Sequence, residues 1–152
     1  MQHEDMDRLI DEHLMAEKAG DPLGSVAMYT PDVIHDVVGP LHGPAAARSS
    51  YEMLTRNITT EQMDVSHAWY GGNFCTIEHQ WHGTVPGEFL GIPGHGRQIS
   101  FRMLHVFKFK QGRISLENVW LDGNAIVTQL TTPSAATPQQ IDQSQATSAQ
   151  DL

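Results

Sequence analysis

The second half of this 152-residue chain alternates apolar and polar residues over two long segments, and this alternation constrains the fold more than any other feature. Successive side chains of a β-strand point to opposite faces of a sheet, so an alternating run predicts a strand with one buried face. Residues 74–85 and 97–109 show the pattern, with apolar residues at odd-numbered positions. Further strands are expected over 62–70 and 113–122. The second half therefore predicts an antiparallel meander.

The first half instead shows the three- and four-residue apolar spacing of helices. One helix is expected to end at Gly20, and a second, short helix to begin at the capping residue Asp21. A third is expected over 44–58, after a strand at 32–38. Helices followed by antiparallel strands predict an α+β domain with the helices packed on one face of the sheet.

Composition excludes several classes of protein. The formal net charge is −9, which is the wrong sign for binding nucleic acid or an anionic membrane surface. A single cysteine forms no intrachain disulfide and no cysteine-based zinc site. The acidic N-terminus has no apolar signal region, so we expect a cytoplasmic protein. Residues 131–152 contain few core-forming residues and predict a mobile polar tail after a domain over 1–130.

The histidines raise the question of function, because nine are present and several fall on apolar faces. His79 and His105 share the odd-numbered faces of the two alternating strands, and His13 lies on the apolar stripe of the first helix. Asp36 is expected to face inward with its neighbours in 32–38. Buried ionisable groups are costly unless they are paired. A cluster of them around one cavity would have shifted pKa values suited to acid–base catalysis.

A metal site is not indicated by local spacing. His79 and His82 are three residues apart, which places them on opposite faces of a strand. No adjacent pair has the geometry of a zinc motif, so we expect neither a metal nor a cofactor. A non-local set of His79, His105 and Asp36 remains a geometric alternative.

Two stretches resemble a known family. Residues 19–54 (AGDPLGSVAMYTPDVIHDVVGPLHGPAAARSSYEML) resemble the N-terminal half of the nuclear transport factor 2-like superfamily, which includes ketosteroid isomerase. Residues 87–130 (GEFLGIPGHGRQISFRMLHVFKFKQGRISLENVWLDGNAIVTQL) resemble the C-terminal half of SnoaL-like polyketide cyclases. The resemblance implies a cone-shaped α+β barrel, a strongly curved antiparallel sheet over three N-terminal helices, with a pocket between them.

The resemblance to ketosteroid isomerase implies roles for residues of the first half. Asp36 falls where that enzyme has its proton-shuttling aspartate, although a one-residue difference in spacing lets His35 take this place. His13 falls at the position of the oxyanion-hole tyrosine, and His105 falls near the oxyanion-hole aspartate. Histidines at these two positions argue against steroid isomerisation itself.

The resemblance to SnoaL-like cyclases implies roles for two further residues. Asp122 matches their acid–base aspartate, and Trp120 matches a pocket tryptophan. Relatives with this fold commonly pair sheet to sheet, which predicts a homodimer.

Two functional hypotheses follow. The first is a cofactor-independent enzyme that moves protons on a small apolar carbonyl compound, as an aldol cyclase, isomerase or dehydratase does. Asp122 or Asp36 would remove the proton, and His105, assisted by His79 or His13, would stabilise the enolate. The remaining predicted pocket residues are His35, Trp81, Phe101, Met103 and Trp120. The second hypothesis is a non-catalytic module of the same fold for ligand binding or dimerisation.

Overall fold

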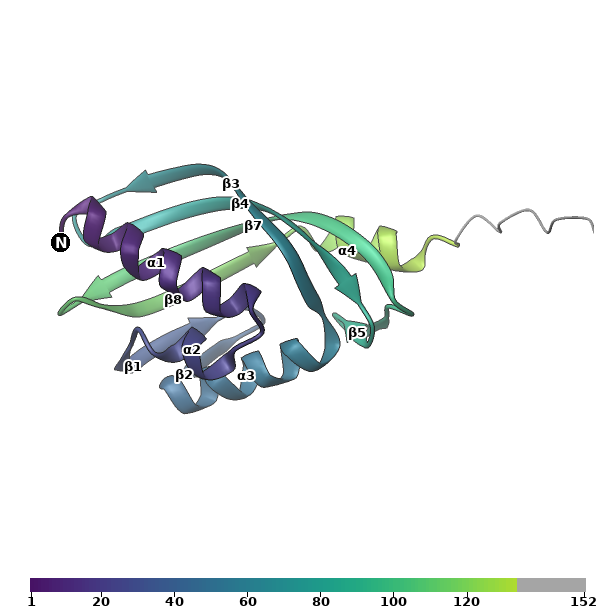
Figure 1. Cartoon of the computed structure of the whole chain (residues 1–152), viewed down its shortest axis with the longest axis horizontal. Coiled ribbons are helices and arrows are strands. Elements are labelled where there is room, and N and C mark those ends of the chain that lie inside the picture. The colour runs from purple at the N-terminus through teal and green to yellow at the C-terminus, as the bar shows by residue number, and fades with distance from the viewer. Residues whose placement is uncertain (134–152) are drawn as a thin grey trace, which may run out of the picture.

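A six-stranded sheet and four helices make up residues 1–133, the part of the chain that the computed structural model describes (Figure 1). The helices are α1 (His3–Lys18), α2 (Pro22–Val26), α3 (Pro44–Asn57) and α4 (Gly123–Thr131). The strands of the large sheet are β1 (Tyr29–Asp36), β2 (Pro40–His42), β3 (Thr59–Tyr70), β4 (Phe74–Val85), β7 (Arg97–Lys110) and β8 (Arg113–Leu121). A separate ribbon consists of β5 (Glu88–Phe89) and β6 (Ile92–Pro93).

The large sheet has the order β2-β1-β8-β7-β4-β3, and its strands pair antiparallel except for the parallel pair β1–β8. The sheet is curved, and α1 crosses one of its faces while α2 and α3 lie beside β1 and β2 (Figure 1). The predicted α+β class, the curved antiparallel sheet and the three N-terminal helices are therefore confirmed.

The space between the helices and the sheet holds two apolar clusters. One gathers α1, α2 and α3 against the sheet around Met6, Tyr29 and Phe107. The other lies toward α4 and the β5–β6 ribbon, around Trp81, Phe101 and Ile126. Alternation buries the odd-numbered positions of β4 and β7, as predicted. The titratable residues described below lie among these buried apolar side chains.

Alternation fails in β1 and β8, and irregular pairing explains the failure. In β8 the register against β7 shifts between Lys108 and Phe109, which leaves Ser115 as an extra residue. A bulge of this kind changes which side chains point inward. Glu117 and Val119 are consequently buried, whereas Trp120, which the resemblance implies as a pocket residue, is exposed.

The end of the domain also differs from the expectation. The predicted strand 113–122 ends at Leu121, and Asp122 begins α4, a helix that the sequence pattern did not reveal. Most of the predicted polar tail, residues 134–152, lies outside the described residues. In the part of the chain that the structure describes, no helix is both long enough and apolar enough to cross a membrane.

Candidate functional site

A single carboxylate, that of Glu117, lies at the centre of a buried polar cluster. Its side chain projects from β8 and is inaccessible to solvent. The hydroxyl of Tyr29 donates a hydrogen bond to Oε2. The hydroxyl of Tyr51, on α3, lies 3.2 Å from Oε1 and 3.1 Å from Oε2. Both tyrosines therefore stabilise a charged carboxylate that is out of contact with water.

His13 supplies the positive charge that balances this carboxylate. Its Nδ1 lies 2.8 Å from the carbonyl oxygen of Ser25, and its Nε2 lies 3.2 Å from Oε1 of Glu117. Burial disfavours the imidazolium, but the charge and hydrogen bond of Glu117 outweigh it and raise the pKa of His13 to about 9. For Glu117 burial again acts against the charged form, while His13 and His35 hold its pKa well below the usual range.

Two further histidines extend the cluster along the sheet. Nε2 of His105 lies 3.5 Å from Oε1 of Glu117, and its Nδ1 lies 3.0 Å from Nε2 of His79. Burial lowers the pKa of His105 to about 3 and that of His79 to about 4, so both rings are neutral at neutral pH. Nδ1 of His79 is buried and has no hydrogen-bond partner among the described residues.

His35 contacts the other side of the carboxylate. It is buried on β1, with Nδ1 3.6 Å from Oε2 of Glu117 and 3.5 Å from the hydroxyl of Tyr29. No hydrogen bond within the described residues involves its Nε2. A proton on Nδ1 is favoured by the carboxylate, and this leaves the lone pair of Nε2 free to act as a base.

Glu17 is a second carboxyl group at this site. It lies one helical turn after His13 on α1, with Oε2 3.8 Å from Nε2 of that histidine. Its side chain is 10% exposed, and Oε2 has no hydrogen-bond partner among the described residues. Burial is the main cause that raises the pKa of Glu17 to about 7.

An apolar cavity adjoins the cluster. Its polar lining, called the polar wall below, consists of Glu17, His35, Tyr51, His105 and Glu117, all of which belong to the buried cluster. The cavity has a volume of about 50 Å³, so a ligand larger than a few atoms enters only when the lining side chains move apart. The apolar lining consists of Val37, Leu54, Ile58, Trp81, Phe89, Phe101, Met103, Val119 and Leu121. The chemistry of this lining, apolar with one polar side, matches a ligand that has an apolar body and one polar end.

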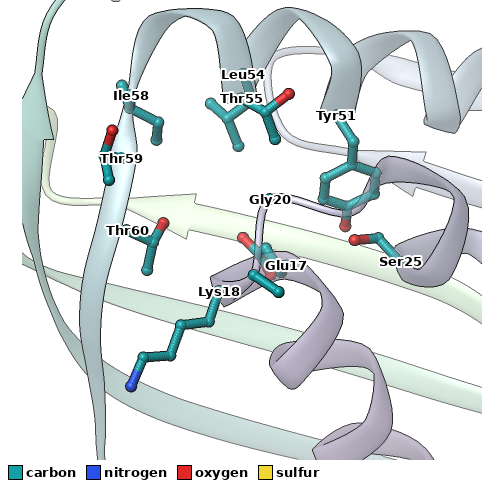
Figure 2. A pocket seen from close by; sticks show the side chains of 11 residues that line it. Glu17, Lys18, Gly20, Ser25, Tyr51, Leu54, Thr55, Ile58, Thr59 and Thr60 are labelled. Carbon is teal, nitrogen blue, oxygen red and sulfur yellow. The ribbon is translucent and has the colours of Figure 1, made fainter.

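A second pocket opens at the C-terminal end of α1, between that helix, α3 and the start of β3. Figure 2 shows Glu17 within it, and the hydroxyl of Tyr51 pointing toward Ser25 and Glu17. Glu17 and Tyr51 line both this pocket and the apolar cavity. These two side chains therefore stand between the interior cluster and a pocket that is open to solvent.

The structure brings together most of the residues that the sequence singled out. The histidines His13, His35, His79 and His105 all belong to the buried cluster. The predicted apolar residues Trp81, Phe101 and Met103 line the cavity, where the rings of Trp81 and Phe101 stack with their centroids 4.9 Å apart.

Three predicted residues lie elsewhere. Asp36 alternates with the buried His35 and is half-buried, with Oδ2 3.4 Å from Nδ2 of Asn118. Asp122 caps α4 and accepts a hydrogen bond of 3.0 Å from the backbone N–H of Ala125. Trp120 is 65% exposed and lines a separate surface pocket together with Asp122, not the apolar cavity. In β8 the bulge at Ser115 is the physical reason, because it turns Glu117 inward and Trp120 outward. In β1 the buried residues include Tyr29, Val33 and His35, so Asp36 falls on the other parity.

Sequence reasoning missed Glu117, Glu17, Tyr29 and Tyr51 as site residues. Glu17 follows His13 by four residues, and this spacing places both side chains on one face of a helix. That signal was available in the sequence. Glu117 gave no comparable signal, because only the bulge at Ser115 turns it inward.

Solved structures of low sequence identity share this architecture. TsrD from Streptomyces laurentii superposes with a TM-score of 0.77 at 19% identity, over 86% of this chain and 98% of TsrD. A provisionally described polyketide cyclase from Xanthomonas campestris gives a TM-score of 0.73 at 18% identity, over 84% of this chain and 98% of that protein. A protein of ketosteroid isomerase-like fold from Catenulispora acidiphila, solved with trimethylamine, gives 0.69 at 14% identity, over 82% and 93%. The chain therefore has the cone-shaped fold that these proteins share.

The family follows from the sequence model that matches. The model of the SnoaL-like polyketide cyclases matches residues 5–130, and the chain belongs to this family. No curated protein sequence matches the chain.

Proposed function

We propose that the chain is an acid–base enzyme that moves a proton on a small, largely apolar substrate bearing a carbonyl group. One observation supports this most directly: a continuous wall of titratable side chains faces a cavity that is otherwise apolar. Apolar lining binds the body of a ligand, and the polar wall orients its one polar group. Aldol cyclisation, isomerisation and dehydration all begin by removing a proton next to a carbonyl group, so each is within this proposal.

His35 is the proposed general base. Its Nδ1 faces Glu117 and Tyr29, and its Nε2 has no hydrogen-bond partner among the described residues. Glu117 acts through His35 as a positioning residue, because its carboxylate favours the tautomer with the proton on Nδ1. This arrangement replaces Asp36 and Asp122, since neither of them lines the cavity.

His105 is the proposed partner that stabilises the developing negative charge. Its ring is neutral, and the 3.5 Å separation between Nε2 and Glu117 is too long for a strong hydrogen bond. An N–H at Nε2 that makes no strong bond to Glu117 can donate to a substrate oxygen. The hydrogen bond to His79 at Nδ1 holds the ring in place.

The experiment measures exchange of the α-protons of 2-tetralone in D2O by NMR, because exchange reports proton removal whatever the natural product is. The wild-type chain is expected to accelerate exchange, and His35→Asn is expected to lower the rate by about 10²-fold or more. His82→Asn is the matched control, since His82 is a partly exposed histidine on β4.

Two outcomes contradict the proposal. Loss of exchange in Asp36→Asn or Asp122→Asn, with full activity in His35→Asn, assigns the base to the aspartates instead. Binding of 2-tetralone, seen as chemical-shift changes at the cavity, without any acceleration of exchange favours a ligand-binding module.

A further inference from the structure

Three side chains of the buried cluster bring together atoms of the kinds that divalent metals prefer as ligands. They are Nε2 of His13, Oε2 of Glu17 and Oε1 of Glu117, and one atom from each residue lies within 4.8 Å of the other two. Two of the residues come from α1, spaced by one helical turn, and the third comes from β8. Imidazole nitrogen and carboxylate oxygen are common ligands of zinc and of related transition metals.

The separations between these atoms suit a shared ion. Zinc binds nitrogen and oxygen ligands at about 2.0–2.2 Å, so two ligands of a tetrahedral ion lie about 3.3–3.6 Å apart. Nε2 of His13 lies 3.2 Å from Oε1 of Glu117 and 3.8 Å from Oε2 of Glu17.

The surrounding hydrogen bonds resemble those that support metal ligands. Metal-binding histidines usually donate their second ring N–H to a carbonyl or carboxylate, which aims the other nitrogen at the ion. His13 makes this contact through Nδ1 to the carbonyl of Ser25, at 2.8 Å. Tyr29 and Tyr51 likewise hold the carboxylate of Glu117 in place.

Glu17 provides an independent observation that points to a ligand. Its side chain is nine-tenths buried, and its Oε2 lies among these groups without a hydrogen-bond partner in the described residues. An unsatisfied carboxylate oxygen in the interior is costly. A divalent cation would satisfy it and would also neutralise the second carboxylate beside it.

We propose that His13, Glu17 and Glu117 bind a divalent transition-metal ion of the zinc or manganese type, and that the ion displaces the proton that Nε2 of His13 carries in the metal-free chain. Three protein ligands leave coordination positions open, which is typical of catalytic rather than structural sites. Glu17 and Glu117 line the apolar cavity, so an open position there would receive a carbonyl oxygen and polarise it. That catalytic role rests on the proposed function, whereas binding of the ion does not. The expectation from the sequence was a pocket without a metal.

An entry path for the ion is present. Glu17 lines the solvent-open pocket at the end of α1 as well as the interior cavity (Figure 2). A hydrated cation can therefore reach Glu17 without crossing the apolar lining on the other side of the cluster.

The test is isothermal titration of the tag-free, EDTA-treated full chain with ZnCl2 and, separately, with MnCl2. One ion per chain is expected to bind with micromolar or tighter affinity. Glu17→Gln removes a ligand charge and is expected to weaken binding by at least about 10-fold, as loss of even a supporting residue does. Glu12→Gln, which alters an exposed carboxylate on the same helix, is the matched control and is expected to bind like the wild type.

A spectroscopic readout identifies the ligands. Co²⁺ in a site of low coordination number gives intense visible absorption bands, and these bands are expected to be lost in Glu17→Gln and in His13→Gln. Because His13→Gln can impair folding, circular dichroism is recorded for each variant, and Glu17→Gln alone decides the outcome if the histidine variant unfolds.

Other results overturn the proposal. One is that the wild type, at about 10 µM, binds neither ion when the ion is in 100-fold excess over protein. The other is that binding persists unchanged in a folded Glu17→Gln variant. Binding lost only in His67→Gln or His82→Gln reports adventitious capture by exposed histidines. Proton exchange with 2-tetralone is measured separately, so metal binding without exchange contradicts only the proposed function.

Discussion

The pair β4–β7 and the pair β1–β8 illustrate two ways in which strands position side chains. The first pair is antiparallel and keeps an unbroken register from Phe74–Lys108 to Val85–Arg97. The second is parallel and irregular, with register shifts on both sides of β8. The regular pair supplies Trp81, Phe101 and Met103 of the apolar lining, and the histidines His79 and His105. The irregular pair supplies His35 and Glu117, the two groups around which the polar wall is built.

The difference shows what a bulge contributes to a site. Regular alternation would place Glu117 on the outer face of the sheet together with other polar residues. The extra residue Ser115 allows Ile114 and Glu117 both to point inward, although they are three residues apart. Bulges are common next to functional sites because they redirect side chains in this way.

The largest expected effect on folding is the difference between two single-residue deletions, one in the regular strand β7 and one at the bulge of β8. Deletion of Leu104 from β7 shifts every following inward side chain to the opposite face, so the variant is expected not to fold. Deletion of Ser115 is expected to leave a folded protein, because Ile114 and Leu116 then alternate regularly and Glu117 still points inward. Circular dichroism with thermal melting distinguishes the two outcomes. A folded Leu104 deletion would mean that register in the regular pair is not specified by burial.

A smaller effect is expected from removing the central carboxylate. Glu117→Ala leaves the buried imidazolium of His13 and the hydroxyls of Tyr29 and Tyr51 without their acceptor. Loss of one partner of a buried ion pair costs about 3–5 kcal/mol, and that cost is expected in urea unfolding. Glu117→Gln, which keeps an acceptor oxygen, is the control and is expected to lose less. Equal stability of Glu117→Ala and the wild type would show that the cluster makes no net contribution to folding.

The smallest effect concerns the outer face of the sheet, where the bulge at Ser115 places Trp120. We propose that this face pairs with a second copy of the chain, as the resemblance to the family implies. Trp120 is 65% exposed and lies opposite Leu104 in the register of β7 and β8. Sedimentation at micromolar concentration is expected to show a homodimer. Trp120→Glu is expected to weaken it by about 10-fold, or about 1.4 kcal/mol. A wild-type chain that sediments only as a monomer contradicts this proposal.

Much of the fold could be predicted because it depends on local patterns. The alternation in residues 74–85 predicted the bounds of β4, and the odd-numbered positions of β7 predicted that His105 is buried. Helix spacing placed His13 inward on α1. In each of these cases the regular geometry of one element determines the direction of its side chains.

The candidate site was only partly predictable because two of its strands depart from regular geometry. A bulge depends on how one strand pairs with its neighbours, and the residues of β8 alone do not reveal it. Asp36 and Trp120 were therefore expected on the inner face, and Glu117 was overlooked. The α4 helix was missed for a related reason, since it begins directly at the end of β8, where Asp122 caps it.

By itself, the sequence determined the class of fold, the order of the main elements and the inward direction of His13, His79 and His105. Those features follow from periodicities within single segments. Only the tertiary structure decided that His35 rather than Asp36 faces the cluster, and that Glu117 rather than Trp120 faces inward. The reason is physical: the bulge that β8 forms against β7 decides which side chains of β8 point inward, and the long-range contacts of the buried carboxylate join residues that are up to 104 positions apart.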